Sequence, residues 1–126
     1  MELTIKSILD KYPTLTKDYK INLYDEYLLK DDNLMVFEKV KEGIYTGHYF
    51  FNSRGRAAIE VAQLLVQKAF SSFAEVIQGL TPINQKGAKW LTLKLGAKSY
   101  GIVETINGPC ELFIMTKDEW RKKWDF

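Results

Sequence analysis

Residues 44–70 read IYTGHYFFNSRGRAAIEVAQLLVQKAF, and the hydrophobic pattern changes period inside this stretch. The first part, Ile44–Phe51, is rich in β-branched and aromatic residues, which is typical of a strand. After a polar turn, the segment Ala57–Phe70 is apolar apart from Lys68 and one narrow stripe formed by Glu60, Gln63 and Gln67. This spacing predicts a helix that packs on a sheet with one edge in water. A strand therefore leads through a glycine-containing turn straight into a helix.

The residues before this stretch predict a second strand. Leu34–Val40 has the same β-forming composition, and two turn-forming runs flank it, Asp31-Asp32-Asn33 and Lys41-Glu42-Gly43. Asp18–Lys30 fits either a short helix or a strand. Ile5–Lys11 predicts one or two helical turns, which end before Pro13.

The residues after the central helix predict a strand, a second helix, a hairpin and a last short helix. We expect the strand at Phe73–Gln78, a turn at Gly79–Pro82, and a helix from Asn84 to Leu95 with Gly96 as its left-handed C-terminal cap. After it we expect a hairpin, with strands at Ala97–Ile106 and Cys110–Thr116 joined by the turn Asn107-Gly108-Pro109. The last element is a short helix that begins at the capping-box pair Thr116 and Glu119.

This order of elements predicts an α/β (α+β) fold: a mixed, mostly antiparallel sheet flanked by helices. The length of 126 residues fits a single domain, 1–126, of which 1–33 is the least defined part. Cys110 is the single cysteine, so an internal disulfide is excluded, and no Cys/His cluster has metal-ligand spacing. No stretch has the composition of a leader or a membrane span, so we expect a cytoplasmic protein. The net charge of +2 does not favour a nucleic-acid partner.

The turn before the central helix is the best candidate for a binding site. The first amides of a helix have no internal partner and carry the positive end of the helix dipole, which suits a phosphate. Gly55 lets the backbone approach a ligand, and Arg54 and Arg56 add positive charge. The same kind of turn also caps helices that bind nothing, so the residues alone leave both interpretations open.

Two segments together resemble the GNAT acyltransferase superfamily. Asn52-Ser53-Arg54-Gly55-Arg56-Ala57 is similar to the family's pyrophosphate turn, Q/R-x-x-G-x-G/A. Asn84, followed by Ala88-Lys89-Trp90-Leu91-Thr92-Leu93-Lys94-Leu95-Gly96-Ala97, is similar to its second signature, an Asn and then A-x-x-L-Y-x-K-L-G-F. The closing stretch through Thr116-Lys117-Asp118-Glu119-Trp120 resembles GNAT C-terminal hairpins. The resemblance covers roughly residues 34 to 120, and the chain looks like a short bacteriophage GNAT-like protein.

The resemblance implies an acetyl-CoA-dependent N-acyltransferase that acts on an amine of a small molecule or a protein. It implies that the strands Ile44–Phe51 and Phe73–Gln78 run parallel and splay, with the pantetheine arm of coenzyme A in the gap. The implied cofactor-binding residues are Phe51, Asn52, Ser53, Arg54, Gly55, Arg56, Ala57 and Asn84. The backbone amides of Ser53–Ala57 would hold the pyrophosphate, and Asn84 would orient the pantetheine.

The chain departs from the family pattern at its catalytic positions. Thr92 stands where the family has the tyrosine that protonates the leaving thiolate, and Thr46 and Gly47 stand where an acidic base is common. One extra residue lies near Gly87. These departures also fit a catalytically inactive GNAT-fold protein, such as a phage structural or host-interaction protein.

Single residues offer further candidates for catalysis. His48 is the only histidine, and histidine is a side chain often used as a general base; the alternative is a strand histidine that simply bonds a neighbour. Tyr45 or Tyr49 could replace the missing phenol, or could only pack. Cys110 fits a buried structural thiol better than a nucleophile. The run 120–124, WRKKW, fits a terminal helix with two packing tryptophans better than a nucleic-acid contact. The oligomeric state, a homodimer included, stays open.

Overall fold

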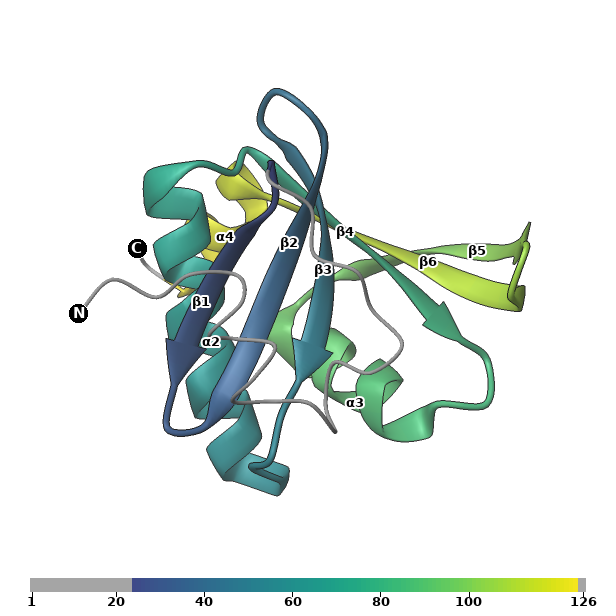
Figure 1. The fold of residues 1–126 in the computed structure, drawn as a ribbon, viewed down its shortest axis with the longest axis horizontal. Helices are drawn as coiled ribbons and strands as arrows, with labels where there is room; N and C mark the ends of the chain where they lie inside the picture. Colours follow the sequence, from purple (N-terminus) through teal and green to yellow (C-terminus); the bar gives the residue numbers. More distant parts are fainter. Residues whose placement is uncertain (1–23, 125–126) are drawn as a thin grey trace.

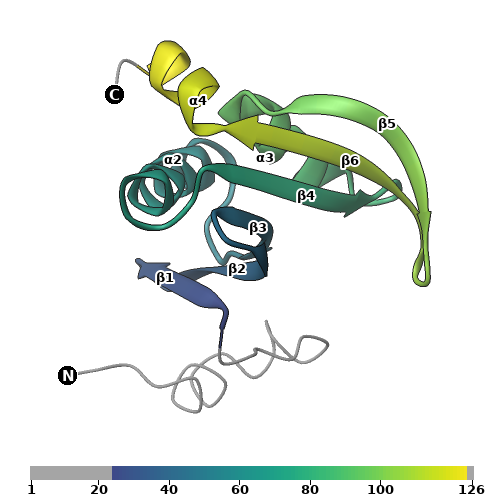
Figure 2. The ribbon, with the colours of Figure 1, turned by 90° about the horizontal axis from the view of Figure 1, so that it is seen from above.

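The strand–turn–helix unit predicted from the sequence lies at the centre of a six-stranded sheet in the computed structural model, which describes residues 24–124. The strands are β1 (Glu26–Lys30), β2 (Asn33–Lys41), β3 (Ile44–Phe50), β4 (Val76–Pro82), β5 (Lys98–Thr105) and β6 (Gly108–Thr116). The helices of this part of the chain are α2 (Gly55–Ser72), α3 (Lys86–Leu95) and α4 (Lys117–Trp124). They lie on the same side of the strongly twisted sheet (Figures 1 and 2).

The sheet has the strand order β1-β2-β3-β4-β6-β5, and every neighbouring pair is antiparallel except β3 and β4. The parallel pairing is short: it runs from Ile44↔Val76 to Thr46↔Gln78. Beyond these residues the two strands diverge, and Figure 2 shows the β1–β3 half and the β4–β6 half of the sheet turning away from each other. This confirms the mixed sheet with one parallel, splayed strand pair.

A core between the sheet and the helices holds the fold together. The apolar side of α2 supplies most of it, because its residues recur at helical spacing and are buried: Ala58, Val61, Ala62, Leu65, Val66, Ala69 and Phe70. Met35 and Phe37 of β2 face this stripe from the sheet. Trp120 of α4 is 2% exposed and packs on Phe70, with ring centroids 5.8 Å apart. The two tryptophans of the C-terminal helix are thus packing residues, as the sequence predicts.

Several predicted boundaries need correction around β4. The helix predicted at Ala57–Phe70 is longer and continues through Ser72, and the next strand begins at Val76 instead of Phe73. The predicted turn Gly79–Pro82 is wrong, because these residues complete β4. Pro82 is tolerated there for a geometric reason. The Ile83 amide donates to Pro109 of β6, so by strand alternation the Pro82 nitrogen faces the open gap, where no ladder hydrogen bond is lost.

The second helix and the final hairpin are also displaced from their predicted limits. Helix α3 begins at Lys86, and Asn84 lies in the turn before it. The hairpin turn is Ile106-Asn107, with Gly108 at φ +103° and Pro109 already in β6. A type I turn followed by a glycine with left-handed backbone gives this geometry. The Asn-Gly pair in the sequence fits both this turn and a two-residue hairpin loop, so the sequence alone does not separate the two.

The remaining local predictions are confirmed where the structure describes them. Residues 26–30 of the ambiguous segment form β1. Gly96 ends α3 at φ +98°, and the amide of Gly96 donates to Leu93. The Glu119 amide donates to Thr116 Oγ1 at 3.2 Å, which is the predicted cap of α4. The predicted helical turns at Ile5–Lys11 lie outside the described residues. Within 24–124, no helix combines the length and the apolar character that a membrane crossing needs.

Candidate functional site

Helix α2 begins with amides that no side chain caps. Arg54 stands at the N-cap with extended backbone (φ −132°, ψ 161°), makes no capping hydrogen bond, and is followed by a first turn without acidic residues. Gly55, the first helical residue, has φ +61°, and a Cβ atom there would meet no atom of the described chain within 4 Å. Arg56 and Ala57 are exposed. The helix therefore presents free N–H groups and its positive dipole end to open space, which favours an anion.

The turn that leads into α2 is held by a residue twenty positions earlier in the chain. Asn33 is fully buried, and its Oδ1 accepts the amides of Asn52 (2.8 Å) and Ser53 (2.9 Å). Its Nδ2 lies 2.9 Å from Ser53 Oγ. The Ser53 amide, expected among the pyrophosphate-binding groups, is therefore already used inside the protein. The amides that stay open to a ligand begin at the helix itself, and Asn33 is a supporting residue that the sequence interpretation did not identify.

Arg54 folds back over the same turn. Its guanidinium Nη1 donates to the backbone oxygens of Phe51 at 2.7 Å and Ser53 at 3.0 Å. These hydrogen bonds keep a positive charge beside the start of the helix. Because a guanidinium has five N–H groups, the remaining donors are available to an anion.

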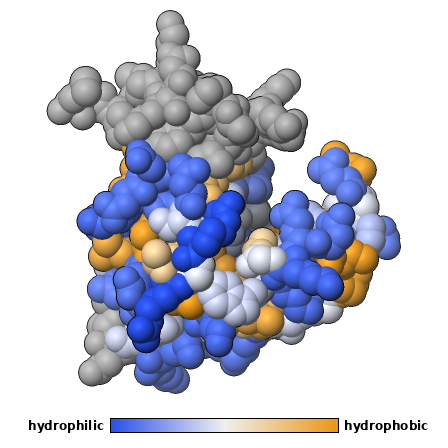
Figure 3. All heavy atoms as spheres, turned by 90° about the horizontal axis from the view of Figure 1, so that it is seen from below, coloured by the Kyte–Doolittle hydropathy of each residue, from blue (hydrophilic) through white to orange (hydrophobic). Residues whose placement is uncertain are grey.

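A pocket of about 340 Å³ opens between the start of α2 and the start of α3. Its walls are Tyr49, Phe51, Ser53, Arg54, Gly55, Ala58, Gly87, Ala88, Trp90 and Leu91. Figure 3 views the molecule from this end, where mostly hydrophilic side chains surround smaller pale and apolar areas. We call this cavity the helix-end pocket. It combines the open amides with a largely apolar wall.

A second pocket of about 280 Å³ occupies the place where β3 and β4 diverge. Both strands contribute to its walls, from Gly47 to Phe50 on β3 and from Ile77 to Pro82 on β4. The floor and far wall come from Met35, Gln85, Ala88, Thr92, Ala97, Phe113 and Met115. Gly79 helps to keep this space open, since a Cβ atom there would meet nothing within 4 Å. We call this cavity the strand-gap pocket.

Thr92 and Tyr49 meet in the wall of the strand-gap pocket. The Thr92 hydroxyl lies 2.8 Å from the Ala88 carbonyl oxygen and 3.3 Å from the Tyr49 hydroxyl. Burial raises the pKa of the Tyr49 phenol, and the hydrogen bond with Thr92 opposes this in part. The sequence weighed Tyr49 and Thr92 separately, and the structure brings them together from positions 43 residues apart.

His48 points to the other face of the sheet and pairs with a carboxylate. Its Nε2 lies 3.1 Å from Glu38 Oε1, and both side chains are partly exposed. His48 lines the strand-gap pocket and also a hollow of about 560 Å³ on the opposite side, bordered by Glu38, Thr46, Leu80 and the β5–β6 turn. The sequence shows no acidic residue next to His48 on β3. Glu38 comes from β2, and only the register of the sheet brings it near.

Three other sequence candidates lie away from these pockets. Asn84 is exposed in the turn after β4 and lines neither of the two pockets, whereas its neighbour Gln85 lines the strand-gap pocket. Tyr45 is buried and packs edge-on against Phe73 at 4.9 Å. Cys110 is 5% exposed in β6, in agreement with a buried structural thiol.

Several solved acetyltransferases have a similar fold. The aminoglycoside acetyltransferase AAC(6')-Ib in complex with coenzyme A aligns with a TM-score of 0.61 at 16% identity, over 77% of this chain and 67% of that one. The ribosomal-protein-S5-alanine acetyltransferase from Vibrio fischeri aligns with a TM-score of 0.56 at 12% identity, over 70% of this chain and 55% of that one. A GNAT-family acetyltransferase from Bacillus anthracis aligns with a TM-score of 0.54 at 21% identity, over 69% of this chain and 59% of that one.

The chain thus spans between 55% and 67% of the length of these three proteins. No protein-family model and no curated protein matches its sequence. The likeness is one of fold: a mixed, mostly antiparallel sheet with one parallel strand pair, flanked by helices. The chain therefore has the fold of the GNAT acetyltransferases.

Proposed function

We propose that this protein binds acetyl-coenzyme A and transfers the acetyl group to an amine. One observation carries the proposal: the strand-gap pocket and the helix-end pocket share Tyr49 and Ala88 in their walls, so they adjoin. One end offers uncapped amides to a phosphate, and the other end is a narrow, mainly apolar slot between two strands. A ligand with a pyrophosphate at one end and a thioester on a thin arm matches this arrangement.

The residues present suit such a ligand. The open amides from Gly55 onward, with Arg54 and Arg56, would hold the pyrophosphate. The ladder between β3 and β4 ends at Thr46↔Gln78. A pantetheine arm would lie along β3 beyond that point, and its amide groups would bond to the strand as a neighbouring strand does. The proposed cofactor-binding residues are those expected from the sequence around this helix start, with Ser53 contributing its side chain because its amide is engaged: Phe51, Asn52, Ser53, Arg54, Gly55, Arg56 and Ala57. Asn84 is a candidate from the sequence alone, because it lines neither pocket.

Two groups of this chain are placed for the chemistry. Acetyl-coenzyme A supplies an activated thioester carbonyl when bound. His48, oriented by Glu38, is proposed as the base that accepts the proton of the attacking amine. Thr92, the catalytic candidate that the sequence offers on the helix side, borders the gap together with its hydrogen-bond partner Tyr49.

A primary amine is the proposed acceptor class. The neighbour AAC(6')-Ib has been solved with the aminoglycosides ribostamycin and kanamycin beside coenzyme A, and another neighbour acetylates an alanine of a ribosomal protein. The hollow beside His48 and Glu38 lies on the side of the sheet away from the helix-end pocket. A cationic amine entering there meets a carboxylate, which favours its approach.

Isothermal titration calorimetry with coenzyme A and acetyl-coenzyme A tests the binding half. We expect binding in the micromolar range, and Ala88→Phe, which fills the junction of the two pockets, should weaken it at least tenfold. Leu93→Phe is the matched control, because Leu93 is an exposed residue of the same helix outside both pockets. No heat at millimolar ligand, or equal affinity in both variants, would contradict the proposal. Acetyl transfer is then measured with a panel of primary amines that includes aminoglycosides.

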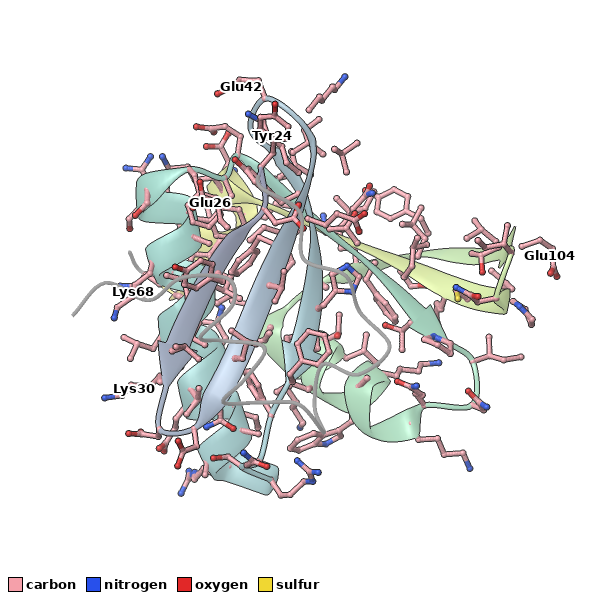
Figure 4. All side chains as sticks on the ribbon, in the orientation of Figure 1. Tyr24, Glu26, Lys30, Glu42, Lys68 and Glu104 are labelled. Atoms are coloured by element: carbon pink, nitrogen blue, oxygen red, sulfur yellow. The ribbon has the colours of Figure 1, made fainter. Side chains whose placement is uncertain are left out.

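A second candidate is a catalytically inactive protein of the same fold, such as a bacteriophage structural or host-interaction protein. The observation that favours it is the projecting β5–β6 hairpin, on which Tyr100, Ile102 and Ile106 are 60%, 58% and 102% exposed. Figure 3 shows apolar surface on this lobe, and Figure 4 places Glu104 at its far end, away from the body. Turnover of acetyl-coenzyme A well above buffer would rule this candidate out.

A further inference from the structure

Tyr49 stands at the junction of the two pockets. It lies on β3, on the face that packs against the helices, and its side chain contributes to the walls of both cavities. The ring packs edge-on against Phe51, with centroids 5.5 Å apart. A ligand that extends from the start of α2 into the strand gap must therefore pass the Tyr49 phenol.

The hydrogen bonds around Thr92 leave the proton of the Tyr49 phenol available. The Thr92 hydroxyl has one proton, and its Oγ1 is the donor toward the Ala88 carbonyl oxygen at 2.8 Å and the Tyr49 oxygen at 3.3 Å. The Tyr49 oxygen therefore accepts from Thr92, and its own proton can be given to a ligand in the gap. Burial raises the pKa of Tyr49, so the phenol keeps its proton at neutral pH. The result is a protonated donor held at a fixed place beside the gap.

Tyr45 shows that this placement is specific to one of the two strand tyrosines. It lies four residues earlier on the same face of β3, and it is 4% exposed. Its ring packs on Phe73, and it lines neither pocket. Of the two phenols considered from the sequence, only that of Tyr49 can reach a ligand in the gap.

We propose that Tyr49 is the general acid of the transfer reaction and that Thr92 is its positioning residue. This inference rests on the proposed function. The amine nitrogen forms a bond to the acetyl carbonyl carbon, and the carbon–sulfur bond breaks. The Tyr49 hydroxyl gives its proton to the departing sulfur, while the proton lost by the amine passes through His48 to water. Water returns a proton to the Tyr49 oxygen after the thiol leaves.

The direct test is a comparison of two ligands in two proteins. Coenzyme A and its desulfo analogue, in which hydrogen replaces the thiol, are titrated by calorimetry at pH 9, where a thiol of ordinary pKa is largely ionised. The wild-type protein should prefer coenzyme A, because the Tyr49 phenol donates to the thiolate. In Tyr49→Phe this preference should fall by about tenfold, as expected for the loss of a hydrogen bond to a charged group. Tyr45→Phe is the matched control and should keep the wild-type preference.

A kinetic measurement adds a second readout. With acetyl-coenzyme A and an amine acceptor, Tyr49→Phe should lower kcat by about 100-fold and leave the KM for acetyl-coenzyme A unchanged. An aryl acetyl thioester, whose thiolate leaves without protonation, should remove most of this difference. Thr92→Val should show a smaller loss than Tyr49→Phe, and Thr92→Ser should restore the wild-type rate.

The outcomes separate this inference from the proposed function. If neither ligand binds the wild-type protein at millimolar concentration, the proposed function fails and the inference fails with it. If both ligands bind, and Tyr49→Phe retains the wild-type preference for coenzyme A, the proposed function stands and the role of Tyr49 is wrong. A change in affinity of Tyr49→Phe that is equal for both ligands would show a packing role and would likewise overturn the proposal.

Discussion

Replacing Asn33 by alanine should loosen the turn that carries the candidate phosphate site. Asn33 is completely buried at the start of β2, and its side chain joins the β1–β2 turn to the residues before α2. Alanine fits a strand position and fills less space, so the change mainly removes hydrogen bonds. The partly buried amides of Asn52 and Ser53 would then lose their partner.

The size of the effect follows from the contacts. Oδ1 accepts two amides, and Nδ2 has two hydrogens for three acceptors within 3.1 Å: Lys30 O, Asp31 O and Ser53 Oγ. At most four hydrogen bonds therefore form at a time, each worth about 1 kcal/mol net. Lys30 and Asp31 are exposed, so water can replace the bonds to their carbonyls. We expect the free energy of unfolding to fall by about 3 kcal/mol.

Urea denaturation followed by circular dichroism measures this change, provided that the m-value stays constant. Asn52→Ala is the matched control, since its exposed side chain makes one bond, to Asp32 O at 2.8 Å, and should lose less than about 1 kcal/mol. The affinity for coenzyme A should fall in Asn33→Ala more than in Asn52→Ala. A loss below about 1 kcal/mol for Asn33→Ala would refute the idea that this side chain holds the turn.

Three further predictions concern stability. Asp31 has φ +50° in the two-residue β1–β2 turn, a backbone conformation that asparagine adopts more readily than aspartate. Asp31→Asn should therefore raise the free energy of unfolding, measured by urea denaturation, by about 0.5 kcal/mol, and a decrease would contradict the turn assignment. Gly96→Ala should lower the free energy of unfolding by about 1–2 kcal/mol, because Gly96 has φ +98° and a residue with a side chain is strained there. An unchanged melting temperature would contradict this prediction. The hydrogen bonds from Ser99 and then from Lys89 lower the pKa of Glu111. Its contribution to stability is therefore present at neutral pH and is lost as pH falls below the ordinary glutamate pKa of about 4.3 and through the lower pKa of the folded state. Glu111→Gln should flatten that part of the dependence of the urea midpoint on pH.

The sequence predicted the parts of the fold that depend on local pattern. The segment 44–70 has a clear change of period, and β3 and α2 lie where that change places them, within a few residues. Gly96 and the Thr116–Glu119 pair were also readable, because caps act over three or four residues. The limits of β4 were not, because Gly79 and Pro82 are turn-forming in isolation and become strand residues only through pairing with β6.

The supporting contacts of the candidate site could not be read from the sequence for a related reason. Asn33 is twenty residues from Ser53, and Tyr49 is 43 residues from Thr92. Strand register and helix packing bring such pairs together, and the spacing of the residues along the sequence does not reveal either of them. Glu38 reaches His48 only because β2 and β3 are antiparallel with Glu38 opposite Thr46.

The three-pair contact between β3 and β4 also has a mechanical meaning. In the part of the chain that the structure describes, backbone bonds link the two halves of the sheet along one short stretch, residues 43–46 with 75–78, so this junction is a natural hinge. A ligand that bonds to both strand edges would act as a staple across it. Amides of β3 and β4 that exchange with deuterium through hinge opening should then slow together on ligand addition, while those of the β5–β6 hairpin keep their rates.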